Sequence, residues 1–236
     1  MIILAFDGTA KIASVAVSQD ERNLALYNID NGLTQSELLL PMAENALKAL
    51  KLSFSDVDIL ATSVGPGSFT GVRIGTALIK GIAFAKGTPC VAVSTLDALA
   101  ENLSGTVGII VPCMDARRNQ VYSAIFRSDG QSITRLTEDR AISIPDLAEE
   151  LKSYDGEDVY LVGDGYEVAY KGLTSSEISL KRTPPALILE NAASVARVAY
   201  REYKSGNYTD DSSLLPTYLR LPQAERERLE KENGGK

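Results

Sequence analysis

The chain has 236 residues, of which 44 % are hydrophobic, so it is long enough for one or two domains with a packed core. Its 31 acidic residues outnumber its 24 basic residues and give a formal net charge of -7, which argues against broad nucleic-acid binding by this chain alone, because such binding needs clustered cations. Histidine is absent, which excludes Ser-His and Cys-His catalytic pairs and every metal site that uses imidazole.

The first half of the chain predicts three short strands followed by alternating helices and strands. The three strands are expected at residues 2–6, 12–18 and 23–29, separated by turn-prone residues. A helix over 36–50, a strand over 59–64, a helix over 71–86, a strand over 90–93 and a short helix near 96–103 follow in that order.

The second half predicts the same order of elements. Strands are expected at 107–111, 120–126 and 132–136, then a helix at 146–152, a strand at 158–162, a turn at 163–165, a strand at 177–180 and a long helix at 187–204. An aspartate follows the first strand of each half, Asp7 in one and Asp115 in the other. This repetition indicates a duplicated ribonuclease-H-like lobe, although other α/β folds share the rhythm.

The run from Gly65 to Gly75 is the most unusual stretch of the chain. Gly71 and Gly75 fall in the early turns of a predicted helix, where each costs about 0.5–1 kcal/mol relative to alanine. A phosphate group or another helix could therefore approach this backbone closely. The run lacks the Gly-Lys-Ser/Thr ending of a phosphate loop, and Ser68 or Thr70 fits an N-cap, so we favour helix packing over a phosphate site.

The helices at 36–50 and 71–86 carry more apolar surface than one buried stripe requires. Thr34 and Glu37 have the spacing of a capping box at the start of the first. Both helices could pack only on their own sheet, or they could also contact a partner. The predicted partner interface is Leu39, Leu40, Ala43, Ala46, Leu47, Gly71, Arg73, Gly75, Leu78 and Ile82.

The turn Asp7-Gly8-Thr9 is the natural place to expect nucleotide chemistry. A carboxylate and a glycine turn can hold magnesium and phosphate through side-chain oxygens and backbone N–H groups. The corresponding second turn, residues 115–118, has no glycine, and its Cβ atoms obstruct a close approach to phosphate. We therefore favour a hairpin turn capped by Asp7, with a vestigial nucleotide site at Asp7, Gly8 and Thr9 as the alternative. We predict no catalytic residue, no metal site and no cofactor.

Two adjacent arginines, Arg117 and Arg118, follow the end of a predicted strand. They could meet the phosphates of an RNA. Because the chain is acidic, pairing with nearby carboxylates is the favoured expectation.

The cysteines Cys90 and Cys113 form no CxxC pattern, so we expect two reduced thiols. The first residues contain no basic segment, and no apolar stretch approaches the roughly 20 residues that span a bilayer. We expect no signal peptide, no membrane association and a cytoplasmic location.

The chain resembles the bacterial TsaB (YeaZ) family over nearly its whole length. The run at 65–75 carries most of the resemblance, and further matching stretches lie at 93–100, 115–118, 163–165 and 216–220. Two positions depart from the family pattern. Gln35 stands where members often have histidine, and Asp7-Gly8-Thr9 stands where Asp-Thr-Ser is usual.

The resemblance implies an α/β fold with two ribonuclease-H-like lobes, as in the actin, sugar-kinase and heat-shock ATPase superfamily. Residues 1–104 would form an N-terminal lobe that carries the partner-binding helices. Residues 105–220 would form a C-terminal lobe whose last long helix packs back between the lobes. The charged residues 221–236 are expected to be disordered or a frayed helix.

The resemblance also implies a non-catalytic scaffold subunit in the formation of N6-threonylcarbamoyladenosine in tRNA. The implied partners are TsaD, the catalytic paralogue, and the ATPase TsaE, with tRNA bound through the complex. The same helices could close a homodimer when TsaD is missing. The alternative is an ATP-dependent carbamoyl or phosphoryl transferase of the same fold that uses Asp7, with Asp115 as a second carboxylate.

Overall fold

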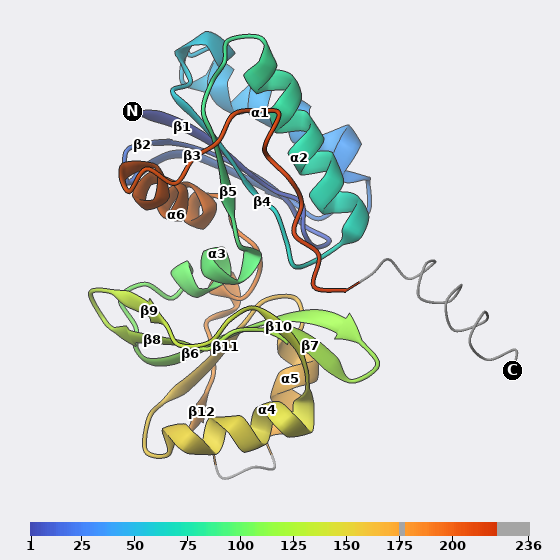
Figure 1. Ribbon diagram of the computed structural model, residues 1–236, viewed down its shortest axis with the longest axis vertical. Helices are drawn as coiled ribbons and strands as arrows, with labels where there is room; N and C mark the ends of the chain where they lie inside the picture. The colour runs from blue at the N-terminus through green and yellow to red at the C-terminus, as the bar shows by residue number, and fades with distance from the viewer. Residues whose placement is uncertain (175–177, 221–236) are drawn as a thin grey trace, which may run out of the picture.

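The computed structural model describes residues 1–174 and 178–220. Two β-sheets with their helices lie one above the other along the long axis of the molecule (Figure 1). The predicted strand at 177–180 begins outside these ranges, and the predicted charged tail at 221–236 lies wholly outside them.

The first sheet has the strand order β3-β2-β1-β4-β5. β1, β2 and β3 pair antiparallel, while β1, β4 and β5 pair parallel. The strands are β1 Ile2–Asp7, β2 Ala13–Gln19, β3 Arg22–Ile29, β4 Ile59–Ser63 and β5 Cys90–Val93. All five predicted strands of the first half are therefore confirmed.

The second sheet repeats this pattern along the path β10-β7-β6-β11-β12. Its first three strands on that path are antiparallel and its last three parallel. The strands are β6 Val107–Arg117, β7 Gln120–Ser123, β10 Arg140–Ser143, β11 Val159–Val162 and β12 Leu180–Lys181, and the hairpin β8 Phe126–Asp129 with β9 Ile133–Arg135 pairs with the start of β6. The predicted duplication is present in the strand directions.

Four elements of the second half differ from the prediction. The single strand expected at 120–126 is divided between β7 and β8, because residues 124–125 pass from one pairing region of β6 to the other. β10 and the helix α5 Tyr166–Leu173 were not predicted. The last helix, α6 Ala192–Lys204, begins later than expected, where the side chain of Asn191 accepts a hydrogen bond from the backbone N–H of Ala193.

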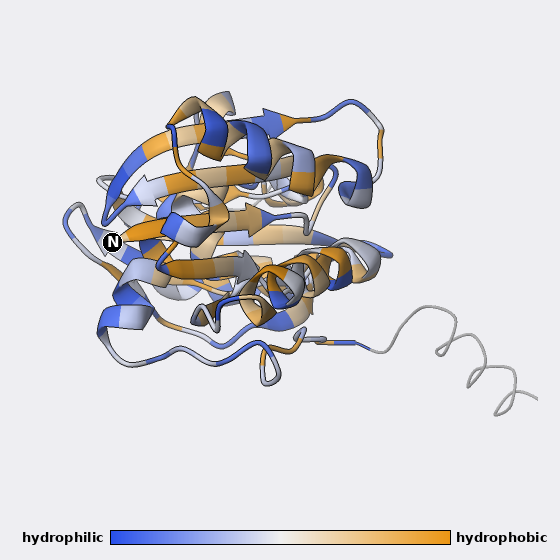
Figure 2. Ribbon diagram, turned by 90° about the horizontal axis from the view of Figure 1, so that it is seen from above, coloured by the Kyte–Doolittle hydropathy of each residue, from blue (hydrophilic) through white to orange (hydrophobic). Residues whose placement is uncertain are grey.

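The helices cover both faces of each sheet, and one helix of each half covers the sheet of the other half. α1 Gln35–Ala49 and α2 Phe69–Phe84 pack on one face of the first sheet, and α6 packs on its opposite face. α4 Ile144–Leu151 and α5 pack on one face of the second sheet, and α3 Thr95–Glu101 packs on the other. Short 3₁₀ turns lie at Phe54–Asp56, Lys152–Tyr154 and Pro185–Leu187. Figure 2 shows the largely hydrophobic strands enclosed between these helices.

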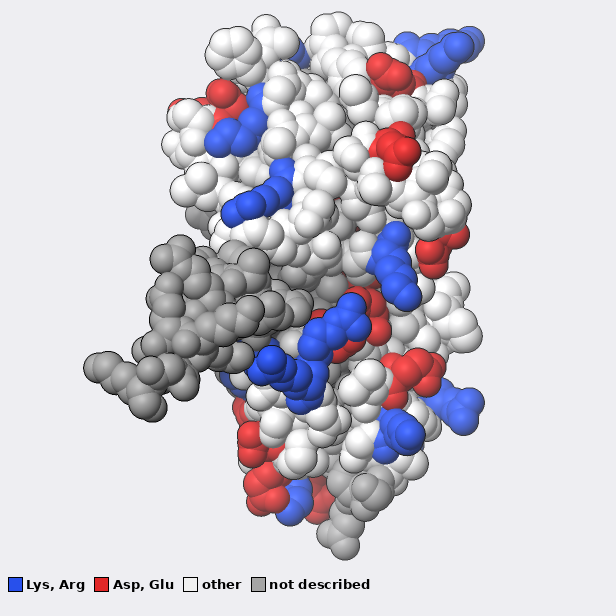
Figure 3. All heavy atoms as spheres, turned by 90° about the vertical axis from the view of Figure 1, so that its right-hand side faces the viewer, with Lys and Arg blue, Asp and Glu red and all other residues white. Residues whose placement is uncertain are grey.

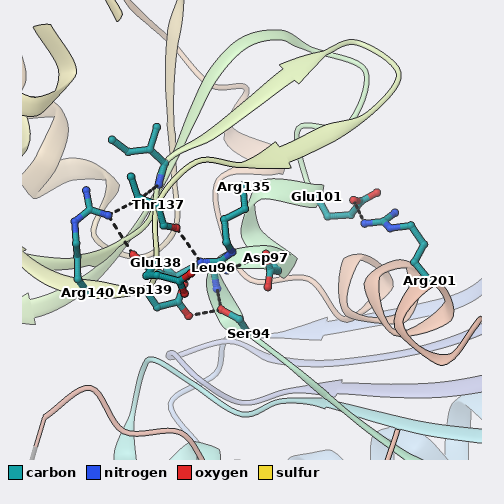
Figure 4. A network of polar contacts seen from close by, with 11 residues as sticks. Ser94, Leu96, Asp97, Glu101, Arg135, Thr137, Glu138, Asp139, Arg140 and Arg201 are labelled. Atoms are coloured by element: carbon teal, nitrogen blue, oxygen red, sulfur yellow. Dashed lines mark hydrogen bonds and ion pairs between the residues drawn. The ribbon is translucent and has the colours of Figure 1, made fainter. Parts of the chain in front are cut away.

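A network of ion pairs joins the lobes around α3 (Figure 4). Arg135 in β9 pairs with Asp97 of α3 at 2.8 Å and with Asp139 at 2.5 Å. Ser94, at the end of β5, donates a hydrogen bond of 2.6 Å to Asp139. Arg197 and Arg201 of α6 both pair with Glu101 of α3. Ion pairs therefore link α3 to β9 of the second sheet and to α6.

Candidate functional site

A cleft of about 390 Å³ opens where the two lobes meet. The turn after β1 and the loop before α2 line it from the first lobe. The β6–β7 hairpin and Asp164 line it from the second lobe, and residues 217–220 also line it. The predicted vestigial nucleotide turn and the second turn therefore lie at one cleft.

Asp7 ends β1 but is buried by its own chain. Its Oδ1 accepts hydrogen bonds from the backbone N–H of Thr9 at 2.9 Å and from the Thr9 hydroxyl at 2.6 Å. Its Oδ2 accepts a hydrogen bond of 2.6 Å from the Ser63 hydroxyl. Burial raises the pKa of Asp7, and these hydrogen bonds oppose the rise. The carboxylate is therefore already occupied by the chain itself.

The glycine run packs against this first turn. A Cβ atom on Gly71 would overlap the carbonyl oxygen of Gly8, and a Cβ atom on Gly67 would lie 2.6 Å from the carbonyl oxygen of Thr9. The backbone N–H of Ser68 donates a hydrogen bond of 2.6 Å to that same Thr9 oxygen. We expected a second helix or a phosphate close to this backbone. The group that approaches Gly71 is instead the turn at Gly8.

The second turn, at the β6–β7 hairpin, is held by side chains. Asp115 Oδ1 accepts a hydrogen bond of 2.8 Å from the backbone N–H of Arg117, whose guanidinium lies 3.2 Å from Asp115 Oδ2. Arg117, Arg118 and Asn119 have φ values of 63°, 54° and 57°. The backbone N–H of Asp115 donates a hydrogen bond of 2.9 Å to Asp164, and burial followed by the charge of Asp115 raises the pKa of Asp164. The expected pairing of Arg117 with a nearby acid is confirmed.

Glu190 lies buried beside these turns and was not predicted as a functional residue. Only 2 % of its surface is exposed, and neither carboxylate oxygen has a hydrogen-bond partner among the described residues. Burial, and then the charges of Asp7 and Asp164, raise its pKa to about 8. In the sequence it is a single glutamate before a helix, so no local pattern could have identified it.

Gln35, at the family's frequent histidine position, holds the β1–β2 turn. Its side-chain N–H donates to the carbonyl oxygens of Ala10 at 2.9 Å, and of Lys11 and Ile12 at 3.4 Å. Three carbonyl groups of one turn thus share one amide donor. The amide fixes the turn that forms one wall of the cleft.

Most residues of the predicted partner interface are buried within the chain. Six predicted residues are buried within the chain: Leu39, Ala43, Ala46, Leu47, Gly71 and Gly75. The four from α1 belong to the core beneath the first sheet. Gly75 faces Thr62, whose hydroxyl would lie 3.0 Å from an added Cβ atom. These side chains contact the chain itself, so they do not form an exposed docking surface.

An apolar outer face of α2 does remain exposed, and we call it the α2 outer face. It consists of Ala77, Gly81 and Phe84, with Arg73 on the same side near the start of the helix and with Leu78 and Ile82 half-buried. Leu40 of α1 is 38 % exposed. The Phe84 side chain is 80 % exposed. An added Cβ atom on Gly81 would meet nothing within 4 Å. Packing within the described chain therefore does not explain why position 81 is glycine.

Arg73 fastens the chain that follows α6 to the start of α2. Its Nε donates a hydrogen bond of 2.8 Å to the Tyr218 hydroxyl, and its guanidinium lies 3.8 Å from the centre of the Phe69 ring. The Phe69 and Tyr218 rings stack with centres 4.5 Å apart. Further along α2, Lys80 donates hydrogen bonds to two carbonyl oxygens of the same chain segment. We call residues 207–220 the strap.

The remaining observations concern metals, thiols and membranes. Within residues 1–174 and 178–220, no group of three or more Asp, Glu or Cys side chains is arranged to hold a metal ion. Cys90 and Cys113 are buried free thiols, as expected. Over the same part of the chain, no helix combines the length and apolar character needed to cross a bilayer.

Comparison with protein families shows a match over residues 34–228 to the family described as TsaD, tRNA N6-adenosine threonylcarbamoyltransferase. The chain is 29 % identical to the tRNA threonylcarbamoyladenosine biosynthesis protein TsaB of Bacillus subtilis, over 98 % of this chain and 99 % of the relative. It is 30 % identical to TsaB of Escherichia coli, over 93 % of this chain and 95 % of the relative.

Solved structures agree with these matches. YeaZ from Pseudomonas aeruginosa superposes with a TM-score of 0.78 at 25 % identity, over 92 % of this chain and 99 % of that one. The component A of the (R)-2-hydroxyglutaryl-CoA dehydratase of Acidaminococcus fermentans superposes with a TM-score of 0.50 at 12 % identity, over 86 % of this chain and 99 % of that one, and shows the fold alone. The two lobes have the predicted fold of the actin and sugar-kinase superfamily. The chain belongs to the TsaB (YeaZ) family of tRNA threonylcarbamoyladenosine biosynthesis proteins.

Proposed function

We propose that this chain is a non-catalytic scaffold subunit that docks on TsaD through the α2 outer face. In the resulting complex it supports TsaE binding while a threonylcarbamoyl group is transferred to the adenosine beside the tRNA anticodon. The complex acts in the cytoplasm on tRNA. The exposed glycine at position 81, within an apolar helix face, is the observation that carries the proposal.

The state of the two aspartate turns supports a role without chemistry of its own. Both oxygens of Asp7 accept hydrogen bonds from Thr9 and Ser63, and the carboxylate is buried. In the glycine loop before α2, which could receive a phosphate, the backbone N–H of Ser68 donates its hydrogen bond to the carbonyl oxygen of Thr9. The carboxylate of Asp115 is bound to Arg117. The groups that the rival transferase would use are therefore engaged within the chain.

The shape of the α2 outer face supports docking of another helix. Arg73, Ala77 and Gly81 follow one another at intervals of four residues, so they lie on one side of the helix. The small side chains at Ala77 and Gly81 let a second helix axis come close, while Phe84 supplies apolar surface for burial. Because TsaD belongs to the same fold family, a matching helix pair on TsaD is the proposed partner surface.

Gly81→Gln tests this docking surface. Glutamine is a better helix former than glycine, so the isolated protein is expected to fold and unfold at an equal or higher temperature. Its side chain projects from the face where the partner helix would pack. We expect the variant to lose stable association with TsaD in analytical ultracentrifugation, and threonylcarbamoyladenosine in tRNA to fall at least tenfold in the reconstituted assay.

Gly81→Ala is the matched control, because one methyl group adds little bulk and raises helix propensity as glutamine does. We expect it to bind TsaD. Normal tRNA modification by Gly81→Gln, together with absent TsaD binding, would contradict the scaffold role. ATP turnover by the chain alone that disappears in Asp7→Ala would favour the rival transferase.

A further inference from the structure

We propose that the basic rim of the interlobe cleft binds a single-stranded segment of RNA, with phosphates on its cations and a base against its aromatic rings. This inference rests on the proposed function, because it assigns this subunit a direct contact with the tRNA of the complex. It also gives a role to Arg117 and Arg118, which docking through α2 leaves unused.

Three cations line the cleft, each from a separate part of the fold, and Arg118 follows one of them in the sequence. Lys11 stands on the β1–β2 turn, Arg117 and Arg118 form the tip of the β6–β7 hairpin, and Arg220 ends the strap. The Arg117 side chain is 84 % exposed although it also pairs with Asp115. Figure 3 shows Lys and Arg side chains gathered at the level where the lobes meet, with acidic side chains among them. This cluster stands out because the chain as a whole has a net charge of -7.

The strap and the hairpin hold this rim in place. Arg220 donates hydrogen bonds to the carbonyl oxygen of Ala116 and to the side chain of Gln120, so the strap end is fastened to the β6–β7 hairpin. At the other end, Arg73 and Phe69 hold Tyr218. The Arg220 guanidinium is thus fixed beside the hairpin, which lowers the entropy lost when a strand binds there.

Aromatic rings lie in the same cleft as the cations. Tyr122, Phe69 and Tyr218 line it, and the guanidinium of Arg220 lies 5.6 Å from the centre of the Tyr122 ring. Proteins bind single strands by combining cations that follow the backbone with aromatic and guanidinium planes that stack on bases. The cleft volume of about 390 Å³ lies within the range of small-molecule pockets, so one nucleotide unit can enter.

The arrangement fits an RNA strand better than a free nucleoside triphosphate. A triphosphate between such lobes needs glycine loops whose backbone N–H groups face the cleft. Here the backbone N–H of Ser68, in the glycine loop before α2, already donates a hydrogen bond to the carbonyl oxygen of Thr9. The β6–β7 turn has Arg117, with a positive φ, where a phosphate-binding turn would have glycine. The carboxylates of Asp115 and Asp164 line the same cleft, so they repel a triphosphate held within it. A strand can place its phosphates on the exposed side chains of Lys11 and Arg117 while only a base enters the cleft.

The double variant Arg117→Asn with Arg118→Asn tests the rim. Asparagine removes the charge and tolerates the positive φ of these positions better than most residues. Binding of unmodified tRNA is measured at several salt concentrations for the full chain, alone and with TsaD. We expect about tenfold weaker binding at low salt, and a salt slope smaller by about 0.7 for each phosphate contact that is lost.

Two further variants test whether any loss of tRNA binding is specific to the cations of the cleft. Arg22→Asn removes an exposed charge at the start of β3, distant from the cleft lining, and should leave affinity and slope unchanged. Lys11→Gln removes one rim cation without touching the hairpin, and should give a smaller loss in the same direction. An unchanged affinity and slope in both rim variants, or saturation of the cleft by ATP with no effect on tRNA, would overturn the inference.

The failure of this inference can be told apart from failure of the proposed function. TsaD association is measured on the same samples by ultracentrifugation. Rim variants that bind TsaD normally and also bind tRNA normally refute the RNA contact alone. Wild-type protein that never binds TsaD refutes the scaffold role, and the measurements with the isolated chain then still decide the RNA contact.

Discussion

Glu190 shows most clearly how a single residue can set the pH response of this protein. Its folded pKa of about 8 exceeds the ordinary value of 4.5. Between these two pH values, Glu190 keeps its proton in the folded protein but loses it in the unfolded chain. The free energy of unfolding is therefore highest below about pH 4.5 and falls as the pH rises toward 8.

Glu190→Gln removes this loss, because an amide carries no charge at any of these pH values. We expect the variant to be more stable than the wild type at pH 7, on the order of 2–3 kcal/mol, with little difference at pH 5. Urea unfolding followed at pH 5, 6, 7 and 8 measures both effects. Parallel stability curves for the two proteins would show that Glu190 does not titrate in this range.

The residues of the cleft also show what a sequence can predict at this scale. Asp7 was placed correctly at the end of a strand and as the cap of its turn, because that depends on neighbours in the chain. Glu190 lies near Asp7 only because distant segments meet, and Gln35 reaches the β1–β2 turn for the same reason. The residue pattern within one segment does not predict such contacts between distant segments.

At the scale of elements, α2 combines two uses of glycine that look alike in sequence. Gly71 and Gly75 are required by contacts within the chain, with the turn at Gly8 and with Thr62. Gly81 has open space around it. The sequence correctly marked α2 as a helix with close contacts on several sides, but it could not assign each glycine to its neighbour. The apolar faces of α1 and α2 were likewise predicted to exceed one buried stripe, but the sequence could not show that the chain's own sheet covers most of them.

The β9 strand and α3 are joined by Arg135, which gives a prediction about the junction between the lobes. Arg135→Gln leaves the carboxylates of Asp97 and Asp139 without their cation, although both remain partly hydrated. Since the Arg135 side chain is 26 % exposed, solvent screening limits the effect. We expect a loss of about 1–2 kcal/mol in unfolding free energy, reduced in 1 M salt.

Thermal and urea unfolding at low and high salt measure this loss. Lys152→Gln is the matched control, since its pairing with Glu149 joins neighbouring turns of one exposed region. It should change stability by less than about 0.5 kcal/mol. An equal loss of unfolding free energy in both variants would show that the Arg135 ion pairs do not stabilise the junction between the lobes.

For the whole molecule, the sequence predicted two repeats of one lobe, and the strand directions confirm them. The order of elements along the chain does not by itself predict which helix covers which sheet. A lobe boundary at residue 104 assigns α3 to the first lobe, although α3 packs on the second sheet. The same boundary assigns α6 to the second lobe, although α6 packs on the first sheet. Helix periodicity shows that one face of a helix is buried, but which sheet covers that face depends on how the chain folds in three dimensions.

This exchange predicts that residues 1–104 do not fold alone. Without α6, one face of the first sheet has lost its cover, and a sheet with one apolar face exposed is prone to associate. We expect the fragment to aggregate or to lack a cooperative unfolding transition in circular dichroism. Coexpression with residues 105–220 should restore a soluble complex with such a transition. A monomeric, cooperatively folded fragment would contradict this dependence.

The same exchange has a consequence for how the protein is made on the ribosome. β5 ends at Val93, whereas α6 begins at Ala192. At translation rates of about 5–20 residues per second, roughly 5–20 s pass between synthesis of the sheet and synthesis of its covering helix. The nascent chain spends that interval with a bare apolar surface, which makes it a natural client for chaperones that bind emerging polypeptides.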